Sequence, residues 1–196
     1  MFDTFYKSIQ SKSILDYENA KILYNQIILC DIPDCATAEI GVYQGMTSKL
    51  IKLALNKQHY CYDTFDGICG SESSNGDKHN NGEFNCGLDI VKQNINMDNI
   101  IYESGLFPIT FKQHHIKFCF VYSDTATYYG TKHTFECFKN NVVCNGKIIF
   151  YKDTNCDGVN NAILEFKDNE MYTVTHINNF IIFTKTTNDL KLIIIK

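Results

Sequence analysis

The stretch Glu39-Ile-Gly-Val-Tyr-Gln-Gly45 places a carboxylate and two glycines where a predicted strand passes into a predicted helix. Glycine at such a turn lets the backbone approach a ligand closely, and the start of a helix favours a ligand carboxylate. The spacing differs from the Gly-x-Gly-x-x-Gly pattern of dinucleotide-binding turns. Taken alone, the stretch is typical either of a ligand-binding loop or of an ordinary tight turn.

A second acidic residue, Asp63, ends the next predicted strand within Tyr62-Asp-Thr-Phe-Asp-Gly67. An acidic side chain about twenty residues after such a turn typically accepts hydrogen bonds from the ribose hydroxyls of an adenosine group. An aspartate is also common there as a helix cap or turn residue. The pair Glu39 and Asp63, in this order of elements, favours an adenosyl ligand.

Strands and helices alternate along the chain, which predicts an α/β fold. Apolar runs predict strands, and apolar residues at intervals of three and four predict helices. The expected strands are residues 36–42, 59–64, 100–103, 116–123 and 147–151, and the expected helices are residues 14–29, 46–56, 88–95, 130–141 and 158–167. We therefore predict one domain with a doubly wound, mostly parallel, seven-stranded Rossmann-like sheet.

The two ends of the chain differ from this alternating pattern. Residues 1–35 are expected to form an N-terminal helical segment. Residues 171–175 and 180–185 lie close together and predict an antiparallel terminal strand pair. Residues 190–195 are expected either to pair at the sheet edge or to trail away from it.

Residues 67–87 are rich in Gly, Ser, Asn and Asp, which predicts a flexible, lid-like loop. His79 lies within it and is a candidate substrate contact. In doubly wound sheets, ligands bind beyond the carboxyl ends of the strands. The loop follows the second such strand end, so we expect it beside the ligand.

Composition narrows the choice of partners and compartment. The formal net charge of −4 and the lack of a basic patch argue against nucleic acid. No run approaches the roughly 20 apolar residues of a membrane span, and no apolar signal core begins the chain. Nine scattered cysteines without a Cys-x-x-Cys pair indicate reduced thiols. We therefore expect a cytoplasmic protein that binds a small molecule, with a homodimer left open.

Five stretches in this order resemble the macrocin O-methyltransferase family of class I methyltransferases, which act on sugar hydroxyls. Two of them are those quoted above. The others are Gly105-Leu-Phe-Pro-Ile-Thr110, Val121-Tyr-Ser-Asp-Thr-Ala-Thr-Tyr128 with Thr131-Lys132, and Asn145-Gly146 leading to Ala162-Ile-Leu-Glu-Phe166. The likeness covers residues 38–166.

This resemblance implies S-adenosylmethionine as the methyl donor and a sugar, nucleotide sugar or glycoside as the acceptor. The amino-acid end of the donor would lie at residues 39–45, its ribose at Asp63 and its adenine near residues 103–105. The cofactor-binding residues implied are Glu39, Gly41, Val42, Tyr43, Gly45, Asp63, Thr64, Phe65, Ser104, Gly105 and Ser123.

The chain departs from the family where metal binding and catalysis would occur. The family has two aspartates separated by one residue after the fourth strand, whereas here Asp124 occupies the first position and Ala126 the second. An Asp-Asp-Tyr is typical after the fifth strand, where this chain has Lys152 and Asp153. A hard cation needs several oxygen ligands, and an ammonium group would repel it. The residues therefore argue against bound magnesium.

The same residues leave the identity of the base open. Methyl transfer to a hydroxyl needs alignment and a group that takes the proton. Asp124 or Asp153 could take it, and Lys152 could supply positive charge or act as base in its neutral form. We expect a metal-independent O-methyltransferase, and the alternative is an inactive scaffold that binds the cofactor or a nucleotide sugar.

Overall fold

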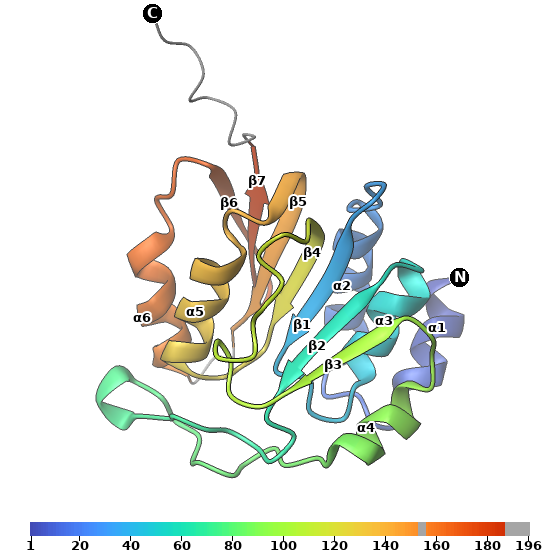
Figure 1. The fold of residues 1–196 in the computed structure, drawn as a ribbon, viewed down its shortest axis with the longest axis horizontal. Helices are drawn as coiled ribbons and strands as arrows, with labels where there is room; N and C mark the ends of the chain where they lie inside the picture. Colours follow the sequence, from blue (N-terminus) through green and yellow to red (C-terminus); the bar gives the residue numbers. More distant parts are fainter. Residues whose placement is uncertain (153–155, 187–196) are drawn as a thin grey trace, which may run out of the picture.

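The computed structural model describes residues 1–152 and 156–186, and it contains the predicted sheet. The strands lie in the order β3-β2-β1-β4-β5-β7-β6 (Figure 1). Neighbouring strands from β3 to β5 are parallel, and β7 is antiparallel to both β5 and β6. The strands are β1 (Ala36–Ile40), β2 (His59–Asp63), β3 (Ile100–Ser104), β4 (Phe118–Ser123), β5 (Val142–Tyr151), β6 (Tyr172–Ile177) and β7 (Phe180–Lys185). The doubly wound sheet with an antiparallel terminal pair is confirmed.

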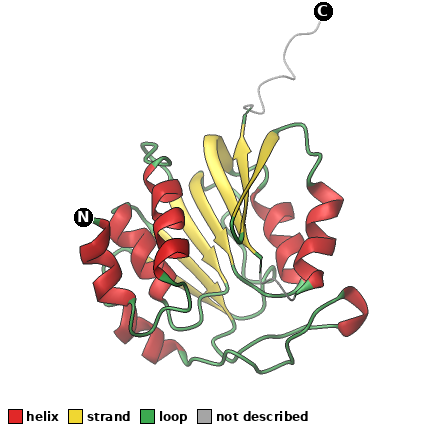
Figure 2. Ribbon diagram, turned by 180° about the vertical axis from the view of Figure 1, so that it is seen from behind, coloured by secondary structure: helices red, strands yellow, loops and turns green. Residues whose placement is uncertain are grey.

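Helices cover both faces of this sheet (Figures 1 and 2). Within the described residues, no helix is both long and apolar enough to cross a membrane. One face carries α1 (Phe2–Ile9), α2 (Tyr17–Ile28), α3 (Met46–Ala54) and α4 (Leu88–Ile95), and the other carries α5 (Tyr128–Phe138) and α6 (Asp157–Phe166). The residues expected at 190–195 lie outside the described part of the chain.

The face under α5 and α6 contains the larger apolar cluster. Phe138 of α5 packs edge-on against Phe118 of β4, with ring centroids 5.0 Å apart. Residues 105–117, all of which are described, form no helix and instead contribute Phe107 and Phe111 to this cluster. These two rings fill the part of the layer that a helix would otherwise cover.

Helix α1 lies within residues 1–35, where an N-terminal helical segment is expected, and its apolar residues recur at helical spacing. A helix of eight residues is marginal by itself, so tertiary contacts must stabilise it. Phe2 and Tyr6 pack on Tyr17, with ring centroids 5.3 and 5.2 Å apart, and Phe2 also contacts Tyr24. Aromatic contacts with α2 therefore hold α1 in place.

Strand β5 begins at Val142, five residues before the start predicted from the apolar run at 147–151. Asn145-Gly146 is typical of a turn, and Asn145 does have a positive φ of 65°. The chain nevertheless continues along β4, because the register shifts between Phe118 and Phe120. The pair is thus accommodated as an irregularity inside the strand, as in a β-bulge.

The strand order reverses at β1, which pairs with β2 on one side and β4 on the other. Connections leaving these strands diverge to opposite faces of the sheet, so a crevice forms at their carboxyl ends. The residues that follow β1, β2 and β4 therefore meet at this point.

Candidate functional site

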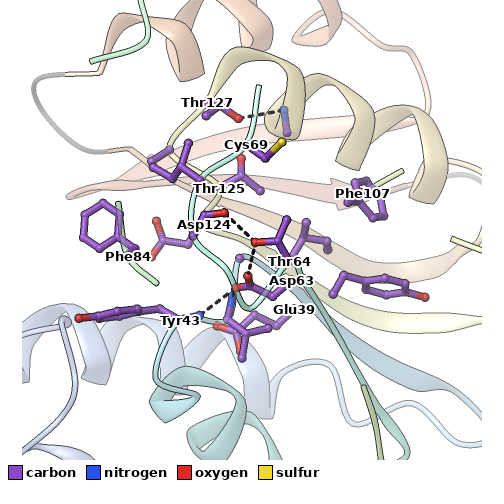
Figure 3. Close-up of a pocket in the computed structure, with 18 of the residues that line it drawn as sticks. Glu39, Tyr43, Asp63, Thr64, Cys69, Phe84, Phe107, Asp124, Thr125 and Thr127 are labelled. Atoms are coloured by element: carbon purple, nitrogen blue, oxygen red, sulfur yellow. Dashed lines mark hydrogen bonds between the residues drawn. The ribbon is translucent and has the colours of Figure 1, made fainter. Parts of the chain in front are cut away.

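A cavity of about 370 Å³ lies at the carboxyl ends of β1, β2 and β4 (Figure 3). Gly41, Asp63 and Asp124, at or just after the ends of these strands, line it. Further walls come from the segment after β3, from the start of α5 and from residues 67–87, which we call the arm. The volume is typical of a small-molecule site. The cavity occupies the crevice where the topology predicts a ligand.

The loop between β1 and α3 lies close against the chain that leaves β4. Asp124 N donates a hydrogen bond to the Ile40 carbonyl at 2.9 Å. Gly41 has φ +83°, and a Cβ atom there would overlap the Asp124 carbonyl oxygen and lie 3.2 Å from Thr125 N. Both the backbone conformation and the close approach require glycine at this position.

The Asp63 carboxylate joins two turns at the floor of the cavity. Its Oδ2 accepts hydrogen bonds from Val42 N at 2.6 Å and Tyr43 N at 3.0 Å. Its Oδ1 accepts one from Phe65 N at 2.8 Å. A carboxylate has about four acceptor positions, so it can also receive a hydroxyl. The structure thus gives Asp63 a role in shaping the loop, in addition to the ribose contact predicted from the sequence.

Glu39 is buried beneath this loop, with 1% of its surface exposed. Ser48 Oγ, from α3, donates a short hydrogen bond to the Glu39 carboxyl group. The same hydroxyl lies 3.0 Å from His59 Nε2, and His59 Nδ1 lies 2.9 Å from Thr37 Oγ1. A buried polar chain therefore runs from the cavity wall to the start of β2.

Burial determines the protonation of this chain. Burial raises the pKa of Glu39 well above its ordinary value, and the negative charges of Asp124 and Asp63 add to the rise, while the Ser48 hydrogen bond opposes it. Burial also lowers the pKa of the His59 imidazole to about 3. Burial therefore favours the neutral form of both side chains.

We expect Glu39→Gln to remove part of the pH dependence of stability. The folded chain holds the Glu39 proton more tightly than the unfolded chain, whose carboxyl ionises near pH 4.5. Stability from this group is therefore complete below that pH and is lost as the pH rises, by up to about 1.4 kcal/mol per pH unit. Urea unfolding of both proteins from pH 4.5 to 8 measures the difference. Parallel curves for the two proteins would contradict a buried, protonated Glu39.

The arm is closed at its base by its own backbone. Ile68 N donates to the Glu83 carbonyl and Gly82 N donates to the Ile68 carbonyl, both at 2.8 Å. Between these limbs lies the short 3₁₀ helix η1 (Ser73–Asn75). Figure 1 shows the arm extending from the strand ends to a position below α5 and α6.

The tip of the arm is attached to the starts of α5 and α6 through Asp77. Its Oδ1 accepts from Tyr128 N at 2.7 Å, and its Oδ2 accepts from Glu72 N at 3.0 Å. Gly158 N donates to the Gly76 carbonyl at 2.9 Å. An acidic side chain at a helix N-terminus is favourable because it satisfies a donor there. Asp77 thus fastens the predicted lid-like loop to the body of the protein.

We expect Asp77→Ala to release the tip of the arm. The arm contains one lysine, Lys78, which is exposed and provides a trypsin site. Loss of a charged cap costs about 1 kcal/mol, so cleavage after Lys78 should become roughly five- to tenfold faster. The control is Ser74→Ala, at an exposed position of η1. Equal cleavage rates in the two variants would show that Asp77 does not hold the arm.

Aromatic side chains connect the arm to the β1–α3 loop. Phe84 packs edge-on against Tyr43, with ring centroids 5.5 Å apart, and His79 packs edge-on against Phe84 at 5.0 Å. Glu83 Oε2 lies 2.8 Å from His79 Nδ1. Tyr43, His79 and Phe84 all line the cavity. The arm therefore forms a wall of the site.

The cavity brings together most of the residues predicted from the sequence. Those that line it are Glu39, Gly41, Val42, Tyr43, Asp63, Thr64, Gly105 and Asp124. Of the other predicted residues, Gly45, Phe65, Ser104, Ser123 and Lys152 are described but do not line it. Asp153 lies outside the described residues.

The predicted residues away from the cavity surface have structural contacts. Gly45, with φ +83°, is the N-cap of α3, and Phe65 offers its N–H to Asp63. The Ser123 hydroxyl lies 3.2 Å from that of Thr134 in α5. Lys152 N donates to the Asn179 carbonyl at 2.7 Å.

Several lining residues carry no signal in the sequence. Lys12 and Leu15 precede α2, and Tyr129 and His133 belong to α5. None belongs to a motif, because the fold alone brings the N-terminal segment and the first turns of α5 to the strand ends. Asp77 is equally unmarked, since an aspartate after glycine in a polar loop is typical of any turn.

The described residues do not provide the set of ligands that a magnesium ion needs. No group of three or more His, Cys, Asp or Glu side chains in residues 1–152 and 156–186 could hold an ion. Ala126 offers no ligand beside Asp124. The described residues therefore do not form a magnesium site.

The strand order and the crevice at the end of β1 match the Rossmann-like fold of solved methyltransferase structures. The chain is similar to the O-methyltransferase NovP, with a TM-score of 0.71 and 19% identity over 87% of this chain and 79% of that one. It is also similar to the calicheamicin methyltransferase CalS11 (TM-score 0.66, 13% identity, 93% and 91% covered). A third similar structure is an O-methyltransferase from Bacillus cereus in complex with S-adenosylhomocysteine (TM-score 0.66, 14% identity, 94% and 91% covered). No protein-family model and no curated protein sequence matches the chain.

Proposed function

We propose that this protein is an S-adenosylmethionine-dependent O-methyltransferase that acts on a hydroxyl group of a small molecule. The observation that carries the proposal is the β1–α3 loop, which Asp63 fixes at the switch point of the sheet with Gly41 against the Asp124 backbone. The O-methyltransferases of the same fold support it, one of them a complex with S-adenosylhomocysteine.

The residues fit an adenosyl cofactor. Gly41 leaves room for it, the start of α3 suits its carboxylate, and Asp63 with Thr64 can receive its ribose. Gly105, which lines the cavity at φ +135°, suits the close approach of an adenine ring. When bound, the cofactor supplies an electrophilic methyl group.

The residues of the chain then align the acceptor and take up a proton. The cavity residues would align the acceptor hydroxyl with the methyl group that the cofactor, held at Gly41 and Asp63, would supply. The hydroxyl proton needs an acceptor in the cavity. We assign this role to Asp124, because it lines the cavity beside the β1–α3 loop, whereas Lys152 does not line the cavity.

A sugar hydroxyl is the acceptor that the family resemblance favours. CalS11, which shares the fold, is described as a TDP-rhamnose 3′-O-methyltransferase. A sugar bound through hydrogen bonds would suit the polar floor of the cavity, where Asp63, Thr64 and Asp124 lie. We therefore propose a sugar hydroxyl as the methyl acceptor.

Calorimetric titration with S-adenosylhomocysteine tests the proposal directly. We expect micromolar binding to the wild-type protein, followed by transfer of a labelled methyl group to a sugar-containing acceptor. No heat of binding would refute the cofactor and the enzyme together. A second outcome is cofactor binding without methyl transfer to any acceptor offered, in the wild-type protein as in the Asp124→Asn variant. That outcome would favour a scaffold that retains the cofactor but has lost catalysis.

We expect methyl transfer to persist after removal of divalent ions with EDTA. Ala126 stands where the family has its second aspartate, and one or two carboxylates rarely hold magnesium without phosphate groups from a substrate. Initial rates before and after dialysis against EDTA should agree within about twofold, since no metal contributes to the barrier. A loss of activity that added magnesium restores would contradict metal independence.

A further inference from the structure

Exposed apolar side chains surround the entrance to the cavity. Ile14, Phe84, Leu106 and Tyr129 all line it, yet 60%, 42%, 43% and 40% of their surfaces are exposed. They come from four separate parts of the chain: the N-terminal segment, the arm, the segment after β3 and α5. Large exposed apolar residues that gather at one opening indicate a binding surface.

Aromatic rings form two groups within this surface. The first consists of Tyr43, Phe84 and His79, which connect the β1–α3 loop to the arm. The second lies on α5, where Tyr129 stacks on His133 with an interplanar angle of 17°. Figure 3 shows Phe84 on the side of Asp124, with Asp63 between it and Phe107. The aromatic wall of the arm thus faces the proton acceptor, beside the region assigned to the cofactor.

The charges that line the cavity do not suit an anionic acceptor. Asp63 and Asp124 are carboxylates, and among the described lining residues Lys12 is the one lysine. Its ammonium group already donates to Asn94 Oδ1 at 2.5 Å. The sequence contains no arginine, so no guanidinium can bind a phosphate with two hydrogen bonds. A diphosphate would therefore meet more negative than positive charge.

We propose that the acceptor is uncharged and joins its hydroxyl-bearing part to a flat aromatic ring. The inference rests on the proposed function. It favours glycosides of aromatic compounds over nucleotide-linked sugars as acceptors. The hydroxyl-bearing part lies at Asp124, and the ring lies against Phe84 and Tyr129 at the entrance. Apolar and edge-on contacts with such rings provide the affinity.

Matched ligands test charge and ring separately. The probes are the 4-nitrophenyl β-glycosides of glucose, galactose and xylose, the three corresponding UDP-sugars and the three free sugars. Each is titrated into the protein saturated with S-adenosylhomocysteine. We expect at least one nitrophenyl glycoside to bind about tenfold more tightly than its UDP-sugar and its free sugar. Equal or tighter binding of the UDP-sugars, or no binding of any nitrophenyl glycoside, would overturn the inference.

Two variants locate the ring. Phe84→Ala and Tyr129→Ala should each weaken binding of the nitrophenyl glycoside about three- to tenfold. Ile109→Ala is the control, because Ile109 is 75% exposed and does not line the cavity within the described residues. Unchanged glycoside binding in both aromatic variants would overturn the inference. Binding of S-adenosylhomocysteine, measured first in each variant, shows independently whether the proposed function holds.

Discussion

Replacement of Gly41 by alanine is expected to abolish binding of S-adenosylhomocysteine, with a loss of at least a hundredfold. The new Cβ would lie 2.8 Å from the carbonyl carbon of Asp124, as well as overlapping its oxygen. Neither neighbour is a flexible side chain, so the β1–α3 loop must move away from the chain leaving β4. That movement displaces the loop from Asp63 and from the ligand. Calorimetry measures the affinity, and thermal unfolding should show a lower Tm.

The positive φ of Gly41 also strains any side chain, and a matched control separates the two effects. Gly82 has φ +87°, but in the described structure a Cβ atom there would contact nothing within 4 Å. Gly82→Ala should therefore show the conformational cost alone, of about 1 kcal/mol, with cofactor affinity intact. Equal losses of affinity in both variants would mean that the contact with Asp124 is not what matters at Gly41.

Removal of the Asp63 carboxylate is expected to destabilise the protein even without ligand. Asp63→Ala leaves the N–H groups of Val42, Tyr43 and Phe65 without their acceptor. Val42 and Phe65 are buried, so we expect a cost of about 2–4 kcal/mol in unfolding free energy. Asp63→Asn keeps one acceptor oxygen and should lose about half as much. Urea unfolding of the ligand-free proteins measures both.

The same variants should bind S-adenosylhomocysteine at least tenfold more weakly, because the loop is no longer held in position. Asp66→Ala is the control, since Asp66 lies in the same turn and is exposed. If Asp63→Ala lost affinity with unchanged stability, the carboxylate would act on the ribose alone. That outcome would favour the role predicted from the sequence over the one that the hydrogen bonds indicate.

The sheet could be predicted because its strands are short apolar runs separated by helical patterns. Strand β4, for example, is buried along all six residues. Helix α1 lies in the segment expected to be helical, but its packing depends on rings of α2 that lie 11 to 22 positions further along the sequence. The early start of β5 could not be predicted from the sequence. Asn145-Gly146 is a strong local turn signal, and pairing with β4 overrides it.

Some residues of the candidate site could be predicted from local sequence, and others could not. Gly41 and Asp63 were identifiable because backbone geometry at the end of a parallel strand restricts the residue types there. Phe84 and Asp77 were not, because their partners, Tyr43 and Tyr128, are 41 and 51 positions away. Asp63 shows a further limit, since sequence spacing predicts that an acid is needed but not which atoms it will bind.

The arm closes on itself before it reaches the rest of the protein. Gly67 and Ile68 meet Gly82 and Glu83 at its base, so the chain leaves and re-enters the body at nearly the same place. A change in arm length therefore costs little closure entropy and leaves the β2–α4 connection intact. The β1–α3 loop follows a strand of the sheet, whereas Phe84 and His79 belong to the arm. Exchange of the arm is therefore expected to change this wall of the cavity, and with it the selectivity for the acceptor proposed above, while the β1–α3 loop and Asp63 stay in place.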